Sequence, residues 1–200
     1  MERWRAALES LGAEAQEITW RYAAFELDPN VPREGADRDT YMSGRYDPAV
    51  MRAVSERLLQ IARDEGLAMA DPASLSVRPN TFDAHRLMTA ALRAGATTQQ
   101  RLGDALFAAH WSRGENVGER AVLVAAAQET GMDADEAATL LAGDELAAEV
   151  RAEEREAALL GIHAVPTFVF ADRFSVSGAQ DPAVLVQAAR QAMGGPHPSG

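Results

Sequence analysis

The residues best suited to chemistry lie in one loop, where His163 is followed by Val165 and Pro166. A peptide bond before proline costs little in the cis form, although only about 5% of such bonds in folded proteins adopt it. The residues alone therefore favour a trans bond. A cis bond would hold the preceding backbone in an unusual shape that faces a ligand. His163 could then meet a substrate thiolate, although exposure in a loop explains this histidine equally well.

Asn80 and His85 are two further polar residues of interest, both at the start of one predicted helix. Asn80 precedes a predicted helix that it could cap, and His85 lies at the border of that helix's apolar face. A packed histidine is the more ordinary explanation of His85. No two histidines have metal-ligand spacing, and the sequence contains no nucleophile elbow, phosphate-binding glycine loop or dinucleotide fingerprint. We therefore expect no metal site.

Composition excludes several classes of function. The chain has no cysteine, so disulfides, thiolate metal sites and cysteine nucleophiles are excluded for its 200 residues. A net charge of -11 at pH 7 argues against a nucleic-acid partner, because neutralising phosphates takes clustered cations. No apolar stretch approaches the roughly 18 residues of a membrane span. Residues 1–5 lack the apolar core of a signal peptide, so we expect no membrane partner and a cytoplasmic location.

A β-hairpin is predicted directly after the proline loop. Residues 167–170 and 174–177 are two short β-branched and aromatic runs with one apolar face, separated by a tight turn. Residues 18–25 alternate as a further strand, and residues 26–46 predict a loop. Hydrophobic spacing predicts helices over approximately 2–11, 47–65, 81–93, 98–111, 119–130, 133–141, 144–160 and 181–193.

Two of these helices have informative surfaces. In the helix from residue 47, one apolar side is formed by Val50, Met51, Val54, Leu58 and Ile61. In the helix from residue 144, an acidic run predicts a solvated face interleaved with arginines; its members are Glu153, Glu154 and Glu156.

Four segments of the sequence resemble the DsbA-like family of thioredoxin-fold proteins. Their order along the chain also matches that family, and the nearest branch contains FrnE-type dithiol oxidoreductases and 2-hydroxychromene-2-carboxylate isomerases. These segments are residues 25–29, 80–87, 106–107 with 114–118, and 161–180.

The resemblance implies an α/β, thioredoxin-like fold of the DsbA type with an inserted all-helical subdomain. Residues 1–46 and 161–200 would form the discontinuous thioredoxin-like domain, and residues 47–160 the insertion. It also implies a cis-proline that faces redox cysteines, and a substrate site containing Val165, Pro166, His163, Asn80 and His85.

The departures from this family concern the N-terminus. Its members begin with an apolar strand that leads into a C-P-x-C-type pair at the start of the first helix, and isomerase relatives carry a serine there. Met1 falls within that helix, so the first strand and the reactive pair are missing. Without a thiol there is no exchange. We expect a shortened oxidoreductase, since the Val165–Pro166 loop is retained, with a degenerate relative as the alternative.

The predicted parent activity is thiol–disulfide oxidoreduction on a protein or small-molecule thiol or disulfide, with no cofactor. One alternative is a glutathione-dependent isomerase of the 2-hydroxychromene-2-carboxylate type, which would need a serine or cysteine nucleophile that is missing here. Another is a non-catalytic module that binds extended peptides. The sequence is compatible with a homodimer and does not decide the oligomeric state.

Overall fold

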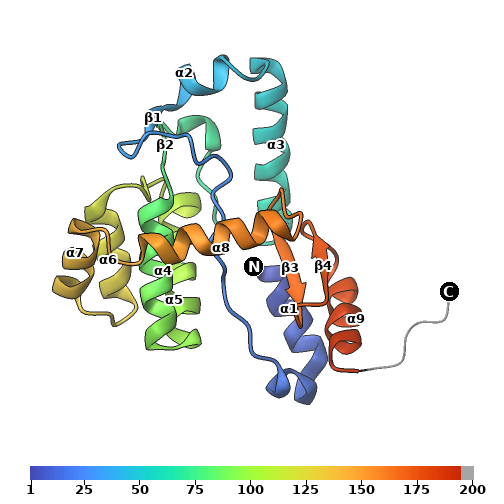
Figure 1. Cartoon of the computed structure of the whole chain (residues 1–200). Helices are drawn as coiled ribbons and strands as arrows, with labels where there is room; N and C mark the ends of the chain where they lie inside the picture. The colour runs from blue at the N-terminus through green and yellow to red at the C-terminus, as the bar shows by residue number, and fades with distance from the viewer. Residues whose placement is uncertain (195–200) are drawn as a thin grey trace. The chain divides into compact units, whose positions relative to one another are not determined.

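A computed structural model describes residues 1–194, which form two compact units (Figure 1). The first unit combines Met1–Trp20 with the described residues from Arg155 onward, and the second is Arg21–Glu154. The predicted domain boundaries, at residues 46 and 160, differ from these. Residues 21–46 belong to the second unit because their partners lie on its helices.

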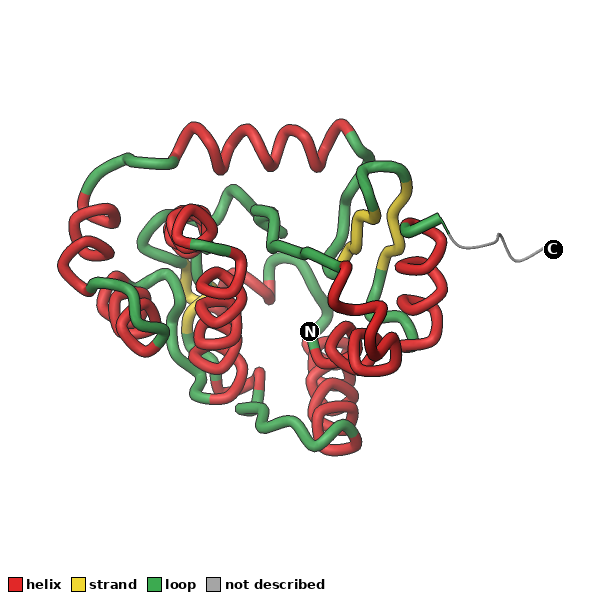
Figure 2. The backbone as a smooth tube through the Cα atoms, turned by 90° about the horizontal axis from the view of Figure 1, so that it is seen from below, coloured by secondary structure: helices red, strands yellow, loops and turns green. Residues whose placement is uncertain are grey.

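The first unit contains two helices and the predicted hairpin. The strands β3 and β4 pair antiparallel from Thr167 opposite Ser177 to Phe170 opposite Phe174, which confirms the predicted bounds (Figure 2). The elements are α1 (Glu2–Leu11), η1 (Gly12–Glu17), β3 (Thr167–Phe170), β4 (Phe174–Ser177) and α9 (Pro182–Ala192).

Aromatic rings join this hairpin to α1. The ring of Trp4 lies 5.8 Å from that of Phe168 and 6.1 Å from that of Phe170, measured between centroids. Leu185 of α9 is fully buried in the same cluster. A small core therefore forms between α1, α9 and one face of the hairpin.

The second unit is helical apart from two very short strands. Its elements are β1 (Ala36–Asp37), α2 (Arg38–Ser43), α3 (Pro48–Asp64), η2 (Pro72–Ser74), β2 (Val77–Arg78), α4 (Phe82–Ala94), α5 (Ala96–Phe107), the π-helical turn η3 (Ala108–Ser112), α6 (Arg120–Glu129), α7 (Ala134–Ala142) and α8 (Ala147–Leu159), whose end belongs to the first unit. The predicted helices are thereby confirmed to within a few residues.

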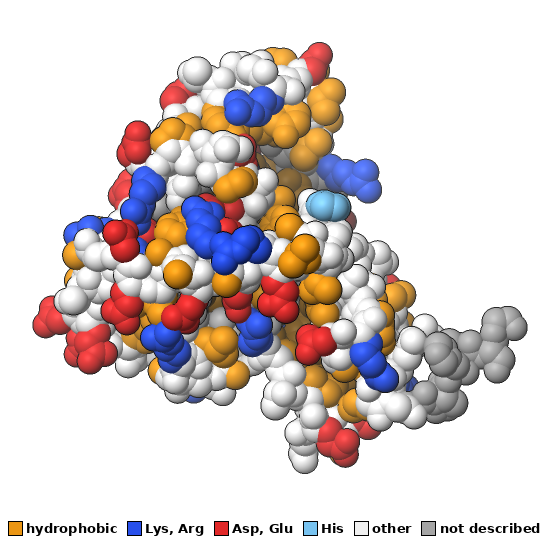
Figure 3. Space-filling model, viewed as in Figure 1, with side chains coloured by type: hydrophobic (Ala, Val, Ile, Leu, Met, Phe, Trp, Pro, Cys, Tyr) orange, Lys and Arg blue, Asp and Glu red, His pale blue; other side chains and the backbone are white. Residues whose placement is uncertain are grey.

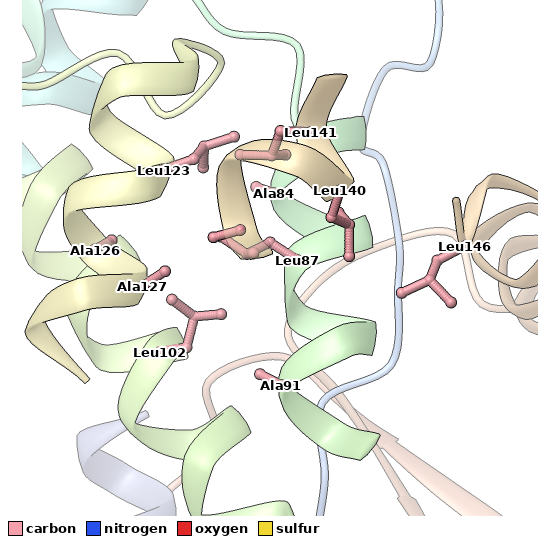
Figure 4. Close-up of a cluster of buried hydrophobic side chains, with 11 residues drawn as sticks. Ala84, Leu87, Ala91, Leu102, Leu123, Ala126, Ala127, Leu140, Leu141 and Leu146 are labelled. Carbon is pink, nitrogen blue, oxygen red and sulfur yellow. The ribbon is translucent and has the colours of Figure 1, made fainter. Parts of the chain in front are cut away.

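The core of this unit lies between α4, α5, α6 and α7. Figure 4 shows Leu87 of α4 directed toward the side chains of the facing helices, including Leu102 and Leu123. All three leucines are fully buried. Alanines at neighbouring positions allow the helices to approach closely.

An arginine is buried beside this apolar core. Arg86 of α4 has no exposed surface. Its Nε donates to the Glu145 carbonyl at 2.8 Å, its Nη2 to the carbonyls of Leu140 and Gly143 at 2.7 Å, and its Nη1 to Asp83 at 2.8 Å. Arg86 therefore supplies hydrogen-bond donors to carbonyls at the end of α7 and in the connection to α8, of which the bond to Leu140 is buried.

The strand predicted over residues 18–25 is wrong. These residues form no ladder, because side chains of helices take the place of a partner strand. The backbone N–H of Tyr22 donates to Gln99 Oε1 at 2.9 Å, and Gln99 Nε2 donates back to the Tyr22 carbonyl at 3.0 Å. The N–H of Ala24 donates to Glu153 Oε2 at 2.8 Å. We call residues 21–26 the extended segment.

The loop predicted over residues 26–46 is also partly wrong, since it contains β1 and α2. Asp37 caps α2 by accepting the N–H of Thr40 at 2.9 Å, and β1 pairs with β2. Gly35, at φ +84°, precedes β1 where a Cβ atom would lie 2.9 Å from Val77, so this turn requires glycine.

The apolar side of α3 is largely exposed. Val50 and Ile61 keep 57% and 38% of their surface accessible, while Ser55 and Ala62 are buried instead. The turn η2 is the main packing partner of α3. The hydrophobic periodicity thus predicted the position of the helix correctly, but not which of its faces is buried.

Replacing Arg86 by methionine tests the role of the buried guanidinium. Methionine keeps most of the volume but leaves three carbonyls without donors, so we expect a loss of about 3 kcal/mol in unfolding free energy. Urea denaturation measures this loss of unfolding free energy. Arg93→Met, at an arginine of the same helix that is more than half exposed, is the control and should cost below about 1 kcal/mol. Equal losses of unfolding free energy in the two variants would contradict this structural role of Arg86.

Candidate functional site

The proline loop of the first unit is exposed. The Val165–Pro166 peptide bond is cis, and His163, Val165 and Pro166 all have accessible side chains. The Pro166 carbonyl accepts the N–H of Gly178 at 2.8 Å, and Thr167 Oγ1 donates to the Ala164 carbonyl at 2.7 Å. The hairpin therefore fixes one end of a loop whose other side chains are free to meet a ligand.

Asn80, in the second unit, ties a loop to the start of α4. Its Nδ2 donates to the Val31 carbonyl at 2.8 Å, and its Oδ1 accepts the N–H of Phe82 at 3.0 Å. The side chain is buried and both of its ends are occupied. Asn80 thus positions the loop around Val31.

His85, one turn along α4, is partly buried. Burial lowers the pKa of His85, because the charged ring would lose hydration, while the nearby carboxylate of Glu154 and the backbone of Phe25 in the extended segment act to raise it. The five predicted site residues therefore form two groups, with Asn80 and His85 in the second unit and the others in the first.

A buried acidic pair on α8 and the extended segment was missed from the sequence. Arg151 Nη1 donates to Glu26 Oε2 at 2.5 Å and to Glu154 Oε2 at 2.6 Å, so two carboxylates converge on one nitrogen. The Glu26 side chain keeps only 2% of its surface. A lone carboxylate between Phe25 and Leu27 was the available signal, because an acid inside an apolar run needs a buried partner.

The solvated face predicted for the acidic run of α8 is wrong for two of its three members. Glu153 and Glu154 turn toward the extended segment, whereas Glu156 is exposed. Elsewhere on α8 acidic and basic side chains are interspersed on the face shown in Figure 3. The sequence pattern could not indicate this for Glu153, since its partner Ala24 is 129 residues away. Glu154 is bonded to the neighbouring Arg151, which also binds Glu26, 125 residues from that arginine.

Burial raises the pKa of Glu26, the repulsion from Glu154 acts in the same direction, and the hydrogen bond from Arg151 opposes both. Within residues 1–194 the Oε1 atoms of Glu26 and Glu154 are buried without a hydrogen-bond partner. Glu26 therefore lies in a buried cluster with a second carboxylate and one guanidinium.

A cavity of about 400 Å³ lies beside this acidic pair. The guanidinium of Arg151 lies over the Phe82 ring at 4.0 Å, and that of Arg33 at 5.8 Å from the same ring. The cavity is lined by Pro29, Val31, Arg33, Asn80, Phe82, Ala147, Ala148 and Arg151. It therefore combines an apolar wall with two cations.

A smaller cavity of about 210 Å³ contains His110, which the π-helical turn η3 carries. Burial lowers the pKa of His110, and the Glu115 carbonyl lies 3.3 Å from its Nδ1. In the described part of the chain no three histidine or acidic side chains are grouped so that they could hold a metal ion. The helices of residues 1–194 include none that is both long and apolar enough for a membrane span.

Replacing Glu26 by glutamine tests the electrostatics of the acidic pair. A pKa raised in the folded chain means that the folded state binds an extra proton above pH 4.5, so this contribution to stability is lost as the pH rises through the raised pKa. We expect Glu26→Gln to gain stability relative to the native chain between pH 4.5 and neutral pH.

Unfolding free energies at several pH values measure this difference, with Glu156→Gln, at an exposed carboxylate of α8, as the control. Parallel pH profiles of Glu26→Gln and the native chain would contradict a titrating Glu26.

Comparison with known proteins identifies the family. Residues 4–190 match the family model of the DSBA-like thioredoxin domain. The crystal structure of a probable DsbA oxidoreductase from Streptomyces coelicolor is 32% identical, with a TM-score of 0.85 over 99% of this chain and 85% of that chain. A 2-hydroxychromene-2-carboxylate isomerase is 17% identical, with a TM-score of 0.63 over 97% of this chain and 90% of that chain. It shares the fold.

No curated protein sequence matches this chain. The predicted fold, α/β and thioredoxin-like with a helical insertion, is nevertheless confirmed. The chain belongs to the DsbA-like thioredoxin domain family.

Proposed function

We propose that this chain is the scaffold of a DsbA-family thiol–disulfide oxidoreductase. The observation that carries the proposal is the 32% identity and TM-score of 0.85 to a probable DsbA oxidoreductase along almost the whole chain. An exposed loop at His163, Val165 and Pro166 supports it, because a protein disulfide needs an accessible surface on which to dock.

The chemistry requires a thiolate that these 200 residues do not contain. In exchange, a thiolate attacks one sulfur of a disulfide, forms a mixed disulfide and releases the other sulfur as a thiolate; a second thiol then displaces the first. No external cofactor is needed, since the substrate's dithiol or disulfide supplies or accepts the electrons. We propose that the reactive pair belongs to residues encoded ahead of Met1, next to the start of α1.

A position next to the start of α1 would make such a cysteine pair more reactive. The N-terminus of a helix lowers the pKa of a nearby thiol, because the unpaired N–H groups stabilise the thiolate. The hairpin strands β3 and β4 pair only with each other in the described residues, so a further strand has a free edge to join. The isomerase, at 17% identity, supports the fold alone.

Reduction of insulin by dithiothreitol tests the proposal. The 200-residue chain should not accelerate it, because it has no thiol. The chain extended by its in-frame upstream residues should do so, and replacing the upstream cysteines by serine should abolish the acceleration. Catalysis by the 200-residue chain, or an inactive extended chain that contains both cysteines, would overturn the proposal. An extension without cysteine would also overturn it and leave a binding module.

A further inference from the structure

We propose that the cavity beside Phe82 binds a small organic monocarboxylate with an apolar body, held by the free edge of the Arg151 guanidinium. This ligand site lies within the second unit and requires no thiol, so it is independent of the oxidoreductase function proposed above.

The guanidinium of Arg151 is only partly used by the protein. Both of its carboxylate partners, Glu26 and Glu154, bind the same nitrogen, Nη1. Among residues 1–194, Nε and Nη2 have no hydrogen-bond partner, and 41% of the side chain is accessible. Guanidinium nitrogens bind a carboxylate through two parallel N–H···O bonds, so a donor pair is available to a planar anion.

The unused donors are held in place before a ligand arrives. The plane of Arg151 packs over the Phe82 ring at 4.0 Å, and the two carboxylates fix its Nη1 end. Arg33, on the same ring at 5.8 Å, is held by Asp83 at 2.7 Å. A fixed guanidinium loses little conformational entropy on binding, which favours recognition of a small ligand.

The rest of the cavity suits an apolar ligand body. Phe82, Val31, Ala147 and Ala148 supply hydrocarbon surface, and the lining contains no carboxylate. The Asn80 amide is already engaged at both ends, because its Nδ2 donates to the Val31 carbonyl and its Oδ1 accepts the N–H of Phe82. The volume of about 400 Å³ falls within the range of roughly 300–1,000 Å³ typical of small-molecule sites.

Charge restricts the ligand to a single negative charge. The two guanidiniums already face four carboxylates, from Glu26, Glu154, Asp83 and Asp144. The whole chain also carries a net charge of -11, which repels anions at long range. A dianionic phosphate would therefore gain less than a monocarboxylate, whose apolar body adds hydrophobic burial.

Isothermal titration calorimetry with 3-phenylpropionate, 3-phenylpropionamide and inorganic phosphate tests the site. We expect binding of the acid but not of the isosteric neutral amide, with phosphate at least about tenfold weaker than the acid. Amide binding equal to that of the acid, tighter phosphate binding, or no binding of the acid at millimolar concentration would each overturn the proposal.

Variants assign the binding to Arg151. Arg151→Lys keeps a cation for Glu26 and Glu154 but removes the paired donors, so affinity for 3-phenylpropionate should fall about tenfold or more. Arg155→Lys, on the exposed surface of the same helix, should leave affinity unchanged. Ala148→Leu, which fills the cavity from an exposed position and does not disturb the ion pairs, should also weaken binding. Unchanged affinity in both Arg151→Lys and Ala148→Leu would overturn the assignment.

Discussion

Side-chain amides and carboxylates hold the extended segment in place, in a position where a sheet would use a neighbouring strand. Gln99 of α5 bonds both the N–H and the carbonyl of Tyr22, as a peptide group of a partner strand would, and Glu153 accepts the N–H of Ala24. The next residues carry Glu26 and the loop that forms one wall of the cavity, up to Arg33. The positions of the acidic pair and of the cavity therefore depend on these few bonds.

Two arginines of the second unit show how the same side chain serves structure or recognition. Arg86 is fully buried, and its guanidinium makes four hydrogen bonds with protein groups, three of them to backbone carbonyls. Arg151 gives one nitrogen to two carboxylates and keeps its remaining donors accessible. A buried guanidinium without such bonds would destabilise the fold, whereas an accessible one can exchange solvent for a ligand.

Local patterns predicted the helices and the hairpin, because their period, caps and turn residues are contained within a few positions. In the structure, for example, Asp47 and Asp181 cap the helices that follow them. The extended segment could not be predicted in this way, since its backbone partners, Gln99 and Glu153, are 77 and 129 residues distant. The inward position of Glu153 could not be predicted for the same reason. Of the residues that line the cavity, Asn80 alone had been singled out from the sequence.

Amide hydrogen exchange, followed by NMR, tests most directly whether helix side chains hold the extended segment. The amides of Tyr22 and Ala24 should be protected in the native chain, because both are bonded to side chains. In Gln99→Leu the Tyr22 amide should exchange about tenfold faster or more, while Ala24, held by Glu153, should keep most of its protection. Exchange of both native amides at the rate of an unstructured peptide, or no change at Tyr22 in the variant, would contradict this arrangement.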